Sequence, residues 1–320
     1  MKIIFLILLS LTVNASDILT NYRTHGLQDI EKKMDSELAK KEYWLEFLEG
    51  KDTTFGYLET FSSVLTCNKE KSTLVLYKQN KNKKFEFAKD YSAFTGKMKG
   101  DKMREGDLTT PLGVYEITKK LSKVDSFYGP LAFVTSYPNT YDRYRGRGGS
   151  GIWIHGLPTD QKRDDYTKGC IAINNPSLEC LDRRIDIENT MLIINSGETK
   201  KDVPKKILAE LLAQLYAWRY AWLYNDIQTY LGFYAPDFMR DDGMSFSAFT
   251  TYKKRVFGKS EKKTIIFDRI NVVPYPSAPD MYQISFKEVY SSDTLKFVGE
   301  KTLMVKLAKD NKFKIFTENQ

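Results

Sequence analysis

The sequence has few of the side chains that bind metal ions or form disulfide frameworks. Only three of its 320 residues are cysteine and only two are histidine. The odd cysteine count and the lack of a C-x-x-C spacing exclude a framework of several disulfides, although a single bond between Cys67 and Cys180 stays open. The cysteines and histidines lie far apart without paired ligand spacing. We therefore expect no metal site, no other cofactor and at least one free thiol.

Long apolar runs are also absent, except at the N-terminus. A short basic start, Met1-Lys2, is followed by the apolar stretch 3–11 and by the small residues Ala15 and Ser16. This order is typical of a secretory signal peptide, and nine or ten apolar residues are too few to span a bilayer. We predict that residues 1–15 are a signal peptide and that the mature protein is periplasmic. An uncleaved anchor or a buried N-terminal helix is the alternative.

The charge balance shows only a modest excess of one sign. Lysine and arginine number 49 against 41 for aspartate and glutamate, which gives a formal net charge of +8. In an envelope compartment this excess suits anionic wall or lipid polymers. The lysine-rich stretch 78–84 is more typical of a solvated face than of a binding site. The sequence contains no nucleic-acid-binding motif, so we expect no nucleic acid as a partner.

Length and composition favour two packed units preceded by a helical arm. With 320 residues, 42% of them hydrophobic and 13% aromatic, the chain can bury two cores. In the arm, residues 16–55, apolar side chains recur at spacings of three to four from Leu27 to Leu48, which predicts an amphipathic helix. We expect this helix to pack on its own domain. Pairing with a second copy, to form a homodimer, is the alternative.

Residues 56–197 have the pattern of a mainly β domain. Short β-branched and aromatic runs alternate with turn residues there. The predicted strands are 74–77, 84–87, 114–118, 132–136, 151–155, 170–173 and 191–194. One helix interrupts them, with Asn175 as its cap, Pro176 in its first turn and Leu178 on its buried side. Cys67 precedes the first of these strands and Cys180 lies in the helix, so we expect both to be packing residues.

A second unit follows a polar linker. The stretch Ser196–Lys206 contains glycine and proline, so we place the linker at 198–206 and the second domain at 207–320. An aromatic-rich helix, 207–233, comes first, and strands are predicted at 264–273, 281–290, 295–307 and 312–316. This order indicates an α+β unit with the helix across an antiparallel sheet. The segment from Trp218 to Phe238 resembles the opening helix of the NTF2-like cone fold, which implies a ligand- or wall-binding cleft.

One cysteine and one histidine have the setting of a catalytic pair. A nucleophilic cysteine needs a nearby base or cation. His155 ends the apolar run G-I-W-I-H-G, and Cys170 opens the run C-I-A-I fifteen residues later. Two strand ends joined by a polar loop can bring the thiol and the imidazole together at one edge of a sheet. Gly169 allows close backbone approach, so the amides of Gly169 and Cys170 are candidate oxyanion donors. Taken alone, such a cysteine is more often a buried apolar residue.

The order of four sequence blocks resembles the YkuD-type L,D-transpeptidase family across about residues 71–194. The blocks are T-G at 95–96, T-P-L-G-V-Y at 110–115, I-W-I-H-G at 152–156 and T-K-G-C-I at 167–171. The resemblance implies that Cys170 is the nucleophile, that His155 is the base and that the Gly156 carbonyl orients the imidazole. The match departs from the family at Lys168, where a histidine is usual, and at Ala172, where an arginine is usual.

Four residues are candidates for substrate binding. Lys168 precedes the nucleophile and would hold a carboxylate or lower the thiol pKa, and a solvated loop lysine is the alternative. Trp153 lies in the histidine block. Arg143 and Arg145 precede the catalytic strand, and their guanidinium groups suit the carboxylates of a wall stem peptide. A mobile glycine-rich surface loop is the alternative reading of this arginine stretch.

The leader, the catalytic domain and the cone-like domain together resemble the cell-shape L,D-carboxypeptidases of curved and helical Gram-negative bacteria. This implies removal of the terminal D-alanine from tetrapeptide stems of peptidoglycan, and wall-shape proteins as further partners. An L,D-transpeptidase that forms crosslinks or attaches proteins to the wall would use the same residues and differ in the acceptor. A non-catalytic wall-binding scaffold is the second alternative.

Overall fold

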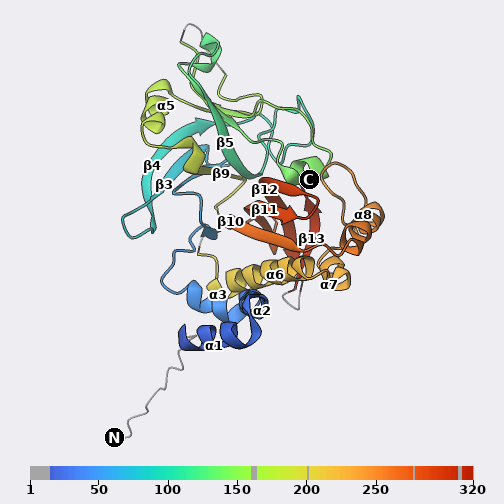
Figure 1. The fold of residues 1–320 in the computed structure, drawn as a ribbon. Coiled ribbons are helices and arrows are strands. Elements are labelled where there is room, and N and C mark those ends of the chain that lie inside the picture. Colours follow the sequence, from blue (N-terminus) through green and yellow to red (C-terminus); the bar gives the residue numbers. More distant parts are fainter. Residues whose placement is uncertain (1–14, 160–163, 200–201, 277, 309–311, 320) are drawn as a thin grey trace, which may run out of the picture.

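The computed structural model describes residues 15–159, 164–199, 202–276, 278–308 and 312–319. The predicted signal peptide therefore lies outside the described residues, apart from Ala15. Two β-rich units lie next to each other, with helices along one side of the second unit (Figure 1). Within the described ranges, no helix has both the length and the apolar character that a membrane crossing requires.

The first unit is a closed barrel with the strand order β2-β3-β4-β8-β7-β6-β5-β9. Two of its neighbouring pairs, β2 with β9 and β7 with β8, are parallel, and the others are antiparallel. The mainly β character that the sequence predicts is confirmed. The strands are β2 (Ser63–Asn68), β3 (Thr73–Gln79), β4 (Phe85–Phe94), β5 (Gly113–Leu121), β6 (Ala132–Thr135), β7 (Trp153–His155), β8 (Ile171–Ile173) and β9 (Thr190–Asn195).

Strand β2 is the strand that the sequence patterns missed. Cys67 lies inside it rather than before the first strand, and it is fully buried. Leu65 and Cys67 belong to the core inside the barrel, whereas Val64 belongs to a second core between the two units. Because both faces of β2 are buried, its sequence lacks the alternation of apolar and polar residues that marks a half-exposed strand.

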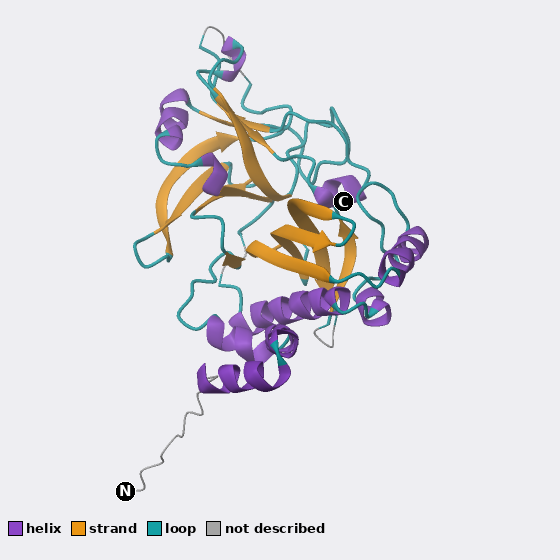
Figure 2. Ribbon diagram, viewed as in Figure 1, coloured by secondary structure: helices purple, strands orange, loops and turns teal. Residues whose placement is uncertain are grey.

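The second unit is a curved antiparallel sheet with the order β1-β10-β11-β12-β13 (Figure 2). Its strands are β1 (Tyr57–Leu58), β10 (Lys263–Pro274), β11 (Met281–Ser292), β12 (Lys296–Leu307) and β13 (Phe313–Glu318). The predicted helix 207–233 is two helices, α6 (Lys205–Leu223) and α7 (Ile227–Gly232). The break follows from Asn225, which has a left-handed φ of 62°, and from Asp226, which caps α7. The helix α8 (Phe246–Gly258) was not predicted.

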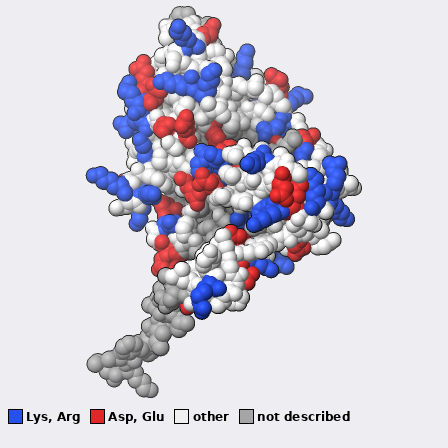
Figure 3. All heavy atoms as spheres, viewed as in Figure 1, with Lys and Arg blue, Asp and Glu red and all other residues white. Residues whose placement is uncertain are grey.

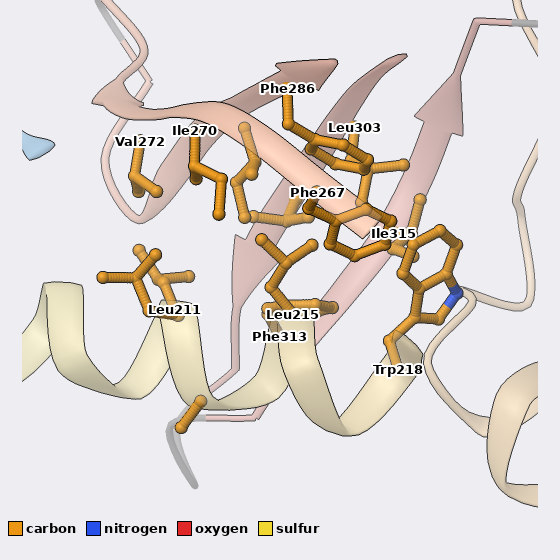
Figure 4. Packing of buried hydrophobic residues seen from close by; sticks show 14 of the residues in the cluster. Leu211, Leu215, Trp218, Phe267, Ile270, Val272, Phe286, Leu303, Phe313 and Ile315 are labelled. Carbon is orange, nitrogen blue, oxygen red and sulfur yellow. The ribbon is translucent and has the colours of Figure 1, made fainter. Parts of the chain in front are cut away.

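Helix α6 packs across one face of this sheet, as the α+β prediction requires. Figure 4 shows Leu211, Leu215 and Trp218 of α6 pointing toward Phe267 and Phe286 of the sheet. All five side chains are at most 7% exposed. Burial of each such side chain stabilises the fold by about 1.5–3 kcal/mol relative to an exposed position, so this layer contributes much of the stability of the unit.

The helices of the N-terminal arm pack on the second unit. It forms the helices α1 (Ala15–His25), α2 (Leu27–Leu38) and α3 (Lys41–Phe47). Trp44 and Leu48 lie in the same core as α6 and the sheet, and Asp35 pairs with Arg219 of α6 at 2.8 Å. Strand β1 pairs with β10, so the start of the range 56–197 is also part of the second sheet. The chain thus enters the second unit before and after it forms the barrel.

The two units share a buried interface next to the short helix α4 (Thr140–Tyr144). Tyr141 of α4 lies edge-on to Tyr275 and Phe316 of the sheet, with ring centroids 5.1 and 5.6 Å apart. The Asn139 amide donates to the Tyr275 hydroxyl at 3.0 Å. Apolar residues of both units form one core cluster at this point, so the barrel is fixed to the second sheet.

Candidate active site

Cys170 and His155 lie on neighbouring parallel strands of the barrel wall. Ile154 pairs with Ile171 and His155 with Ala172, and Cys170 comes directly before β8. Ile154 and Ile171 point into the barrel core. Because side chains alternate along a strand, His155 and Cys170 lie together on the outer face. The pair is therefore inside a continuous barrel wall, and not at the edge of a sheet as the sequence suggested.

The imidazole of His155 is held by the backbone that follows it. Its Nδ1 lies 2.7 Å from the carbonyl oxygen of Gly156, and the residue is only 1% exposed. A carbonyl oxygen can only accept a hydrogen bond, so Nδ1 carries the proton. In the neutral ring the lone pair is then on Nε2, the nitrogen that a general base uses.

Two residues that were not predicted as part of the site support this histidine. The Tyr128 ring lies edge-on to the imidazole at 5.0 Å between centroids, and the Tyr128 carbonyl accepts from Gly156 N at 2.8 Å. Asn175, predicted as a helix cap, instead accepts from Leu157 N at 2.8 Å and donates to Leu157 O at 3.1 Å. The cap of α5 (Asn175–Asp182) is Asn174. These contacts fix the chain on both sides of Gly156.

The thiol of Cys170 is half-buried beside a glycine-rich loop. Its Sγ donates to Gly151 O at 3.3 Å. Gly169, the preceding residue, has a φ of +137°, which L side chains rarely adopt. A β-carbon at Gly169 would also lie 3.0 Å from Thr109 O. The position before the nucleophile therefore requires glycine for both its conformation and its space.

The turn before the thiol is organised by Thr167. Its hydroxyl donates to Cys170 O at 2.7 Å and accepts from Gly169 N at 3.0 Å. The Gly169 amide, one of the two predicted oxyanion donors, is thus occupied by the Thr167 side chain in this conformation. The Cys170 amide stays a prediction. Thr167, the first residue of the block T-K-G-C, therefore stabilises this turn, a role that the spacing alone did not indicate.

Hydrogen bonds join the sequence blocks around the thiol. Thr167 N donates to Thr95 O at 2.8 Å, and Lys97 N donates to Thr167 O at 3.1 Å. Gly96 N donates to Thr110 Oγ1 at 2.8 Å. The blocks that begin at Thr95, Thr110 and Thr167 therefore meet at one end of the barrel, where they shape the surroundings of Cys170.

The predicted substrate-binding residues lie in different surroundings. Lys168 is exposed beside the nucleophile, and Trp153 lies on the same face as Cys170, half-buried against Tyr128 at 5.1 Å. For Arg143 and Arg145, substrate binding stays a prediction. Arg143 donates to Asp241 of the second unit at 2.8 Å, and Arg145 pairs with Asp101 at 2.8 Å. Both guanidinium groups therefore have carboxylate partners within the chain.

The other cysteines differ from Cys170 in their surroundings. All three thiols are free, so the possible bond between Cys67 and Cys180 is not formed. Complete burial raises the pKa of the Cys67 thiol to about 12. A hydrogen bond from Arg184 Nε, 3.2 Å from the Cys180 sulfur, lowers the pKa of that thiol. Cys180 is therefore a second candidate for reaction with thiol reagents.

Buried charges also gather inside the second unit. Glu288 and Glu318 are nearly inaccessible, and Lys301 donates to Glu318 at 2.9 Å. Lys253 lies 4.8 Å above the Trp222 ring. Burial lowers the pKa of Lys253 to about 8 and raises the pKa of Glu288. A cleft was expected in this unit, but these residues were not predicted.

Metal-ligand side chains do not cluster within the described residues, and charges of both signs are mixed on the visible face. In the part of the chain that the structure describes, no three His, Cys, Asp or Glu side chains come together as a metal site would require. Basic and acidic side chains are interspersed over the face shown in Figure 3. A broad basic surface of the kind that binds nucleic acid is not visible on that face.

Comparison with known proteins adds independent findings. Residues 62–194 match the model of the L,D-transpeptidase catalytic domain (YkuD), and residues 210–319 match the Cds6 C-terminal NTF2-like domain. The crystal structure of the helical cell shape determining protein Pgp2 from Campylobacter jejuni is 37% identical, with a TM-score of 0.80. The match covers 88% of this chain and 99% of the Pgp2 chain.

Two further similarities are more distant. The structure of Bd1075 from Bdellovibrio bacteriovorus is 26% identical, with a TM-score of 0.62, and the match covers 84% of this chain and 96% of that one. YafK of Escherichia coli strain K12, whose name assigns it to the L,D-transpeptidases, is 32% identical over 113 residues. This match covers 35% of the chain and 42% of YafK, so the chain spans less than half of that relative.

Proposed function

The chain belongs to the YkuD L,D-transpeptidase family, and we propose that it acts as a peptidoglycan L,D-carboxypeptidase. One observation carries the proposal. His155 and Cys170 lie on the same face of adjacent parallel strands, and the Gly156 carbonyl holds Nδ1 so that Nε2 is the basic nitrogen. This is the arrangement that a thiol nucleophile and its proton acceptor require.

The proposed reaction is a two-step acyl transfer. The Cys170 thiol loses its proton to His155 Nε2, and the thiolate attacks the carbonyl at the L-centre of meso-diaminopimelate in a tetrapeptide stem. The amide bond breaks, the terminal D-alanine leaves as an amine with a proton from His155, and a thioester remains. Water, deprotonated by His155, then cleaves the thioester, which restores the thiol and releases a tripeptide stem.

Hydrolysis and crosslinking differ only in the acceptor of the acyl group. An amine of another stem in place of water would give a crosslink, so an L,D-transpeptidase is the second candidate. Two departures from the family pattern favour water. Lys168 stands where the family has a histidine, and Ala172 stands where it has an arginine, so groups that would handle a second stem are changed. Ala172 is also fully buried, which leaves no room for a longer side chain without rearrangement.

The wider setting follows from the same proposal. Export through the N-terminal leader would place the enzyme in the periplasm, where its substrate is found. Pgp2 is described as a helical cell shape determining protein, and we propose a comparable influence on cell shape for this chain. The helices of the arm expose Leu19, Tyr22, Leu27 and Met34, so pairing with a second copy or with other wall-shape proteins stays a prediction.

The test is mass spectrometry of purified disaccharide-tetrapeptide after incubation with the mature protein. Loss of one alanine by the wild type, and no loss with Cys170→Ala or His155→Ala, is the expected result. Crosslinked dimers would favour the transpeptidase. An unchanged substrate with the wild type would contradict the enzyme and favour a wall-binding scaffold. Cys67→Ala is a control for cysteine replacement away from the site, because Cys67 is buried in the barrel core.

A further inference from the structure

The nucleophile lies between two loops that come from distant parts of the sequence. The first loop is 97–112 and the second is 145–152. A β-carbon at Gly169 would be 3.0 Å from Thr109 O of the first loop and 3.2 Å from Ile152 Cδ1 of the second. Cys170 Sγ donates to Gly151 O of the second loop. The separation of the two loops therefore sets the space around the thiol.

The second loop is poorly able to hold its own shape. It contains four glycines, and Gly146, Gly149 and Gly151 have left-handed φ values of 68°, 87° and 75°. Glycine loses more conformational freedom on ordering than any other residue, so such a loop needs external contacts to stay in one conformation. Its polar residue Arg147 is nonetheless buried, at 5% exposed.

Asp101 of the first loop supplies those contacts. Its Oδ2 accepts from Arg145 Nη1 at 2.8 Å and from Arg147 Nη1 at 2.5 Å. Its Oδ1 accepts from the backbone amides of Lys102 and Leu112, each at 2.8 Å. One carboxylate thus joins the two ends of the first loop to both arginines of the second.

A second carboxylate completes the charge balance. Asp142 is fully buried and lies 3.0 Å from Arg145 and 3.6 Å from Arg147. The two arginines therefore face two carboxylates. Removal of the Asp101 charge would leave one guanidinium uncompensated in a half-buried position, and the cost of that imbalance favours separation of the loops.

We propose that Asp101 is a positioning residue of the active site, which holds the two loops at the separation that the thiol and the substrate require. This inference rests on the proposed function, since it assigns Asp101 a part in that reaction. It gives a function to the pairs that Asp101 forms with Arg145 and Arg147. Misplacement of reacting groups by about 1 Å can lower the rate about 100-fold, so a loss of 10- to 100-fold in kcat/KM is the expected effect.

The test compares Asp101→Asn with the wild type, both in a Cys180→Ser background. Three quantities are measured: kcat and KM on disaccharide-tetrapeptide, the rate of Cys170 alkylation by iodoacetamide between pH 5 and 9, and the unfolding temperature. We expect a lower kcat, and alkylation slowed at least threefold at neutral pH, at temperatures where the variant is fully folded. Asp101→Glu, which keeps the charge, should restore part of both rates.

Glu300→Gln is the matched control, because it removes a carboxylate from an exposed pair with Arg269. Its rates should stay within twofold of the wild type. The inference is overturned if folded Asp101→Asn also stays within twofold for both kcat/KM and alkylation. If Asp101→Asn does not fold, Arg145→Lys serves instead, since it keeps the charge but loses the guanidinium fork; unchanged rates would again overturn the inference.

Alkylation separates this inference from the proposed function. If the wild type leaves the stem peptide intact but Asp101→Asn still slows alkylation of Cys170, the positioning role stands and the proposed reaction is wrong. If the wild type removes D-alanine and Asp101→Asn does so equally fast, the reaction stands and the positioning role is wrong.

Discussion

The side-chain oxygen of Asn175 occupies the space that a β-carbon would need at Gly156. It lies 2.2 Å from that position, and 2.5 Å from the corresponding position at Gly129. Both glycines are required by this one amide, which also accepts from Leu157 N. Since the Gly156 carbonyl in turn holds His155 Nδ1, the amide of Asn175 controls the orientation of the imidazole through the backbone.

We expect Asn175→Ala to lower kcat about tenfold, because loss of its two hydrogen bonds to Leu157 loosens the backbone that orients His155. Asn174→Ala is the matched control. Asn174 caps α5 by accepting from Ser177 N, so its loss should cost about 1 kcal/mol of stability without slowing the reaction. Steady-state kinetics and urea unfolding of both variants test this. Equal kcat values for the two variants would contradict it.

Gly169→Ala should lower the alkylation rate of Cys170 and the turnover together. The added β-carbon would lie 3.0 Å from Thr109 O, and the backbone φ of +137° is one that residues with side chains rarely adopt. Strain of this kind costs about 1–3 kcal/mol, so a five- to hundredfold loss is expected. Gly148→Ala, where a β-carbon meets nothing within 4 Å, should stay close to wild type. Similar losses in both variants would mean that loop flexibility, and not the space at residue 169, matters.

The three thiols should react with iodoacetamide in a definite order. At neutral pH the Cys67 thiol should stay unmodified in the folded protein, because burial raises its pKa to about 12. Cys180 should react alongside Cys170, because Arg184 lowers its pKa. Peptide mapping at increasing times measures the order. In Cys180→Ser the remaining fast reaction should vanish on His155→Ala; its persistence would argue against the catalytic pair.

The half-buried Lys253 predicts a specific pH dependence of stability. Burial lowers its pKa to about 8 in the folded state, below its ordinary 10.5. Between these values the unfolded chain keeps a proton that the folded protein releases, so stability rises with pH through this window and is lower below pH 8. Unfolding temperatures of the wild type minus those of Lys253→Met should therefore increase from pH 8 to pH 10. A constant difference would show that Lys253 is solvated in solution.

The sequence predicted those parts of the fold whose period is visible along the chain. The alternation is clear in β11, where every second residue from Tyr282 to Tyr290 is buried. Strand β2 was missed because it is buried on both faces. The break between α6 and α7 was also missed, although Asp226 offered the signal of a helix cap.

The candidate site, like the fold, could be predicted only in part from the sequence. Cys170, His155 and Gly156 were predicted because the chemistry and the family motif both indicate them, and the structure places them on adjacent strands or directly beside them. Tyr128, Asn175 and Asp101 were not found, since their roles depend on contacts with residues that lie far away in the sequence. The internal partners of Arg143 and Arg145 were not predicted, because guanidinium groups suit a substrate carboxylate and an internal one equally well.

The pairing of β1 with β10 has a consequence for the order in which the chain acquires its structure. Trp44, Leu48 and Tyr57 are buried in a core whose other side is formed by α6 and the sheet, and the whole barrel is inserted between them. A chain synthesised at roughly 5–20 residues per second takes on the order of ten seconds to produce the barrel. The barrel can fold during this delay, because its strands are contiguous in sequence. The arm cannot pack at this stage, because its partners α6 and β10 lie in the last third of the chain. The second unit is therefore completed from an N-terminal and a C-terminal segment together.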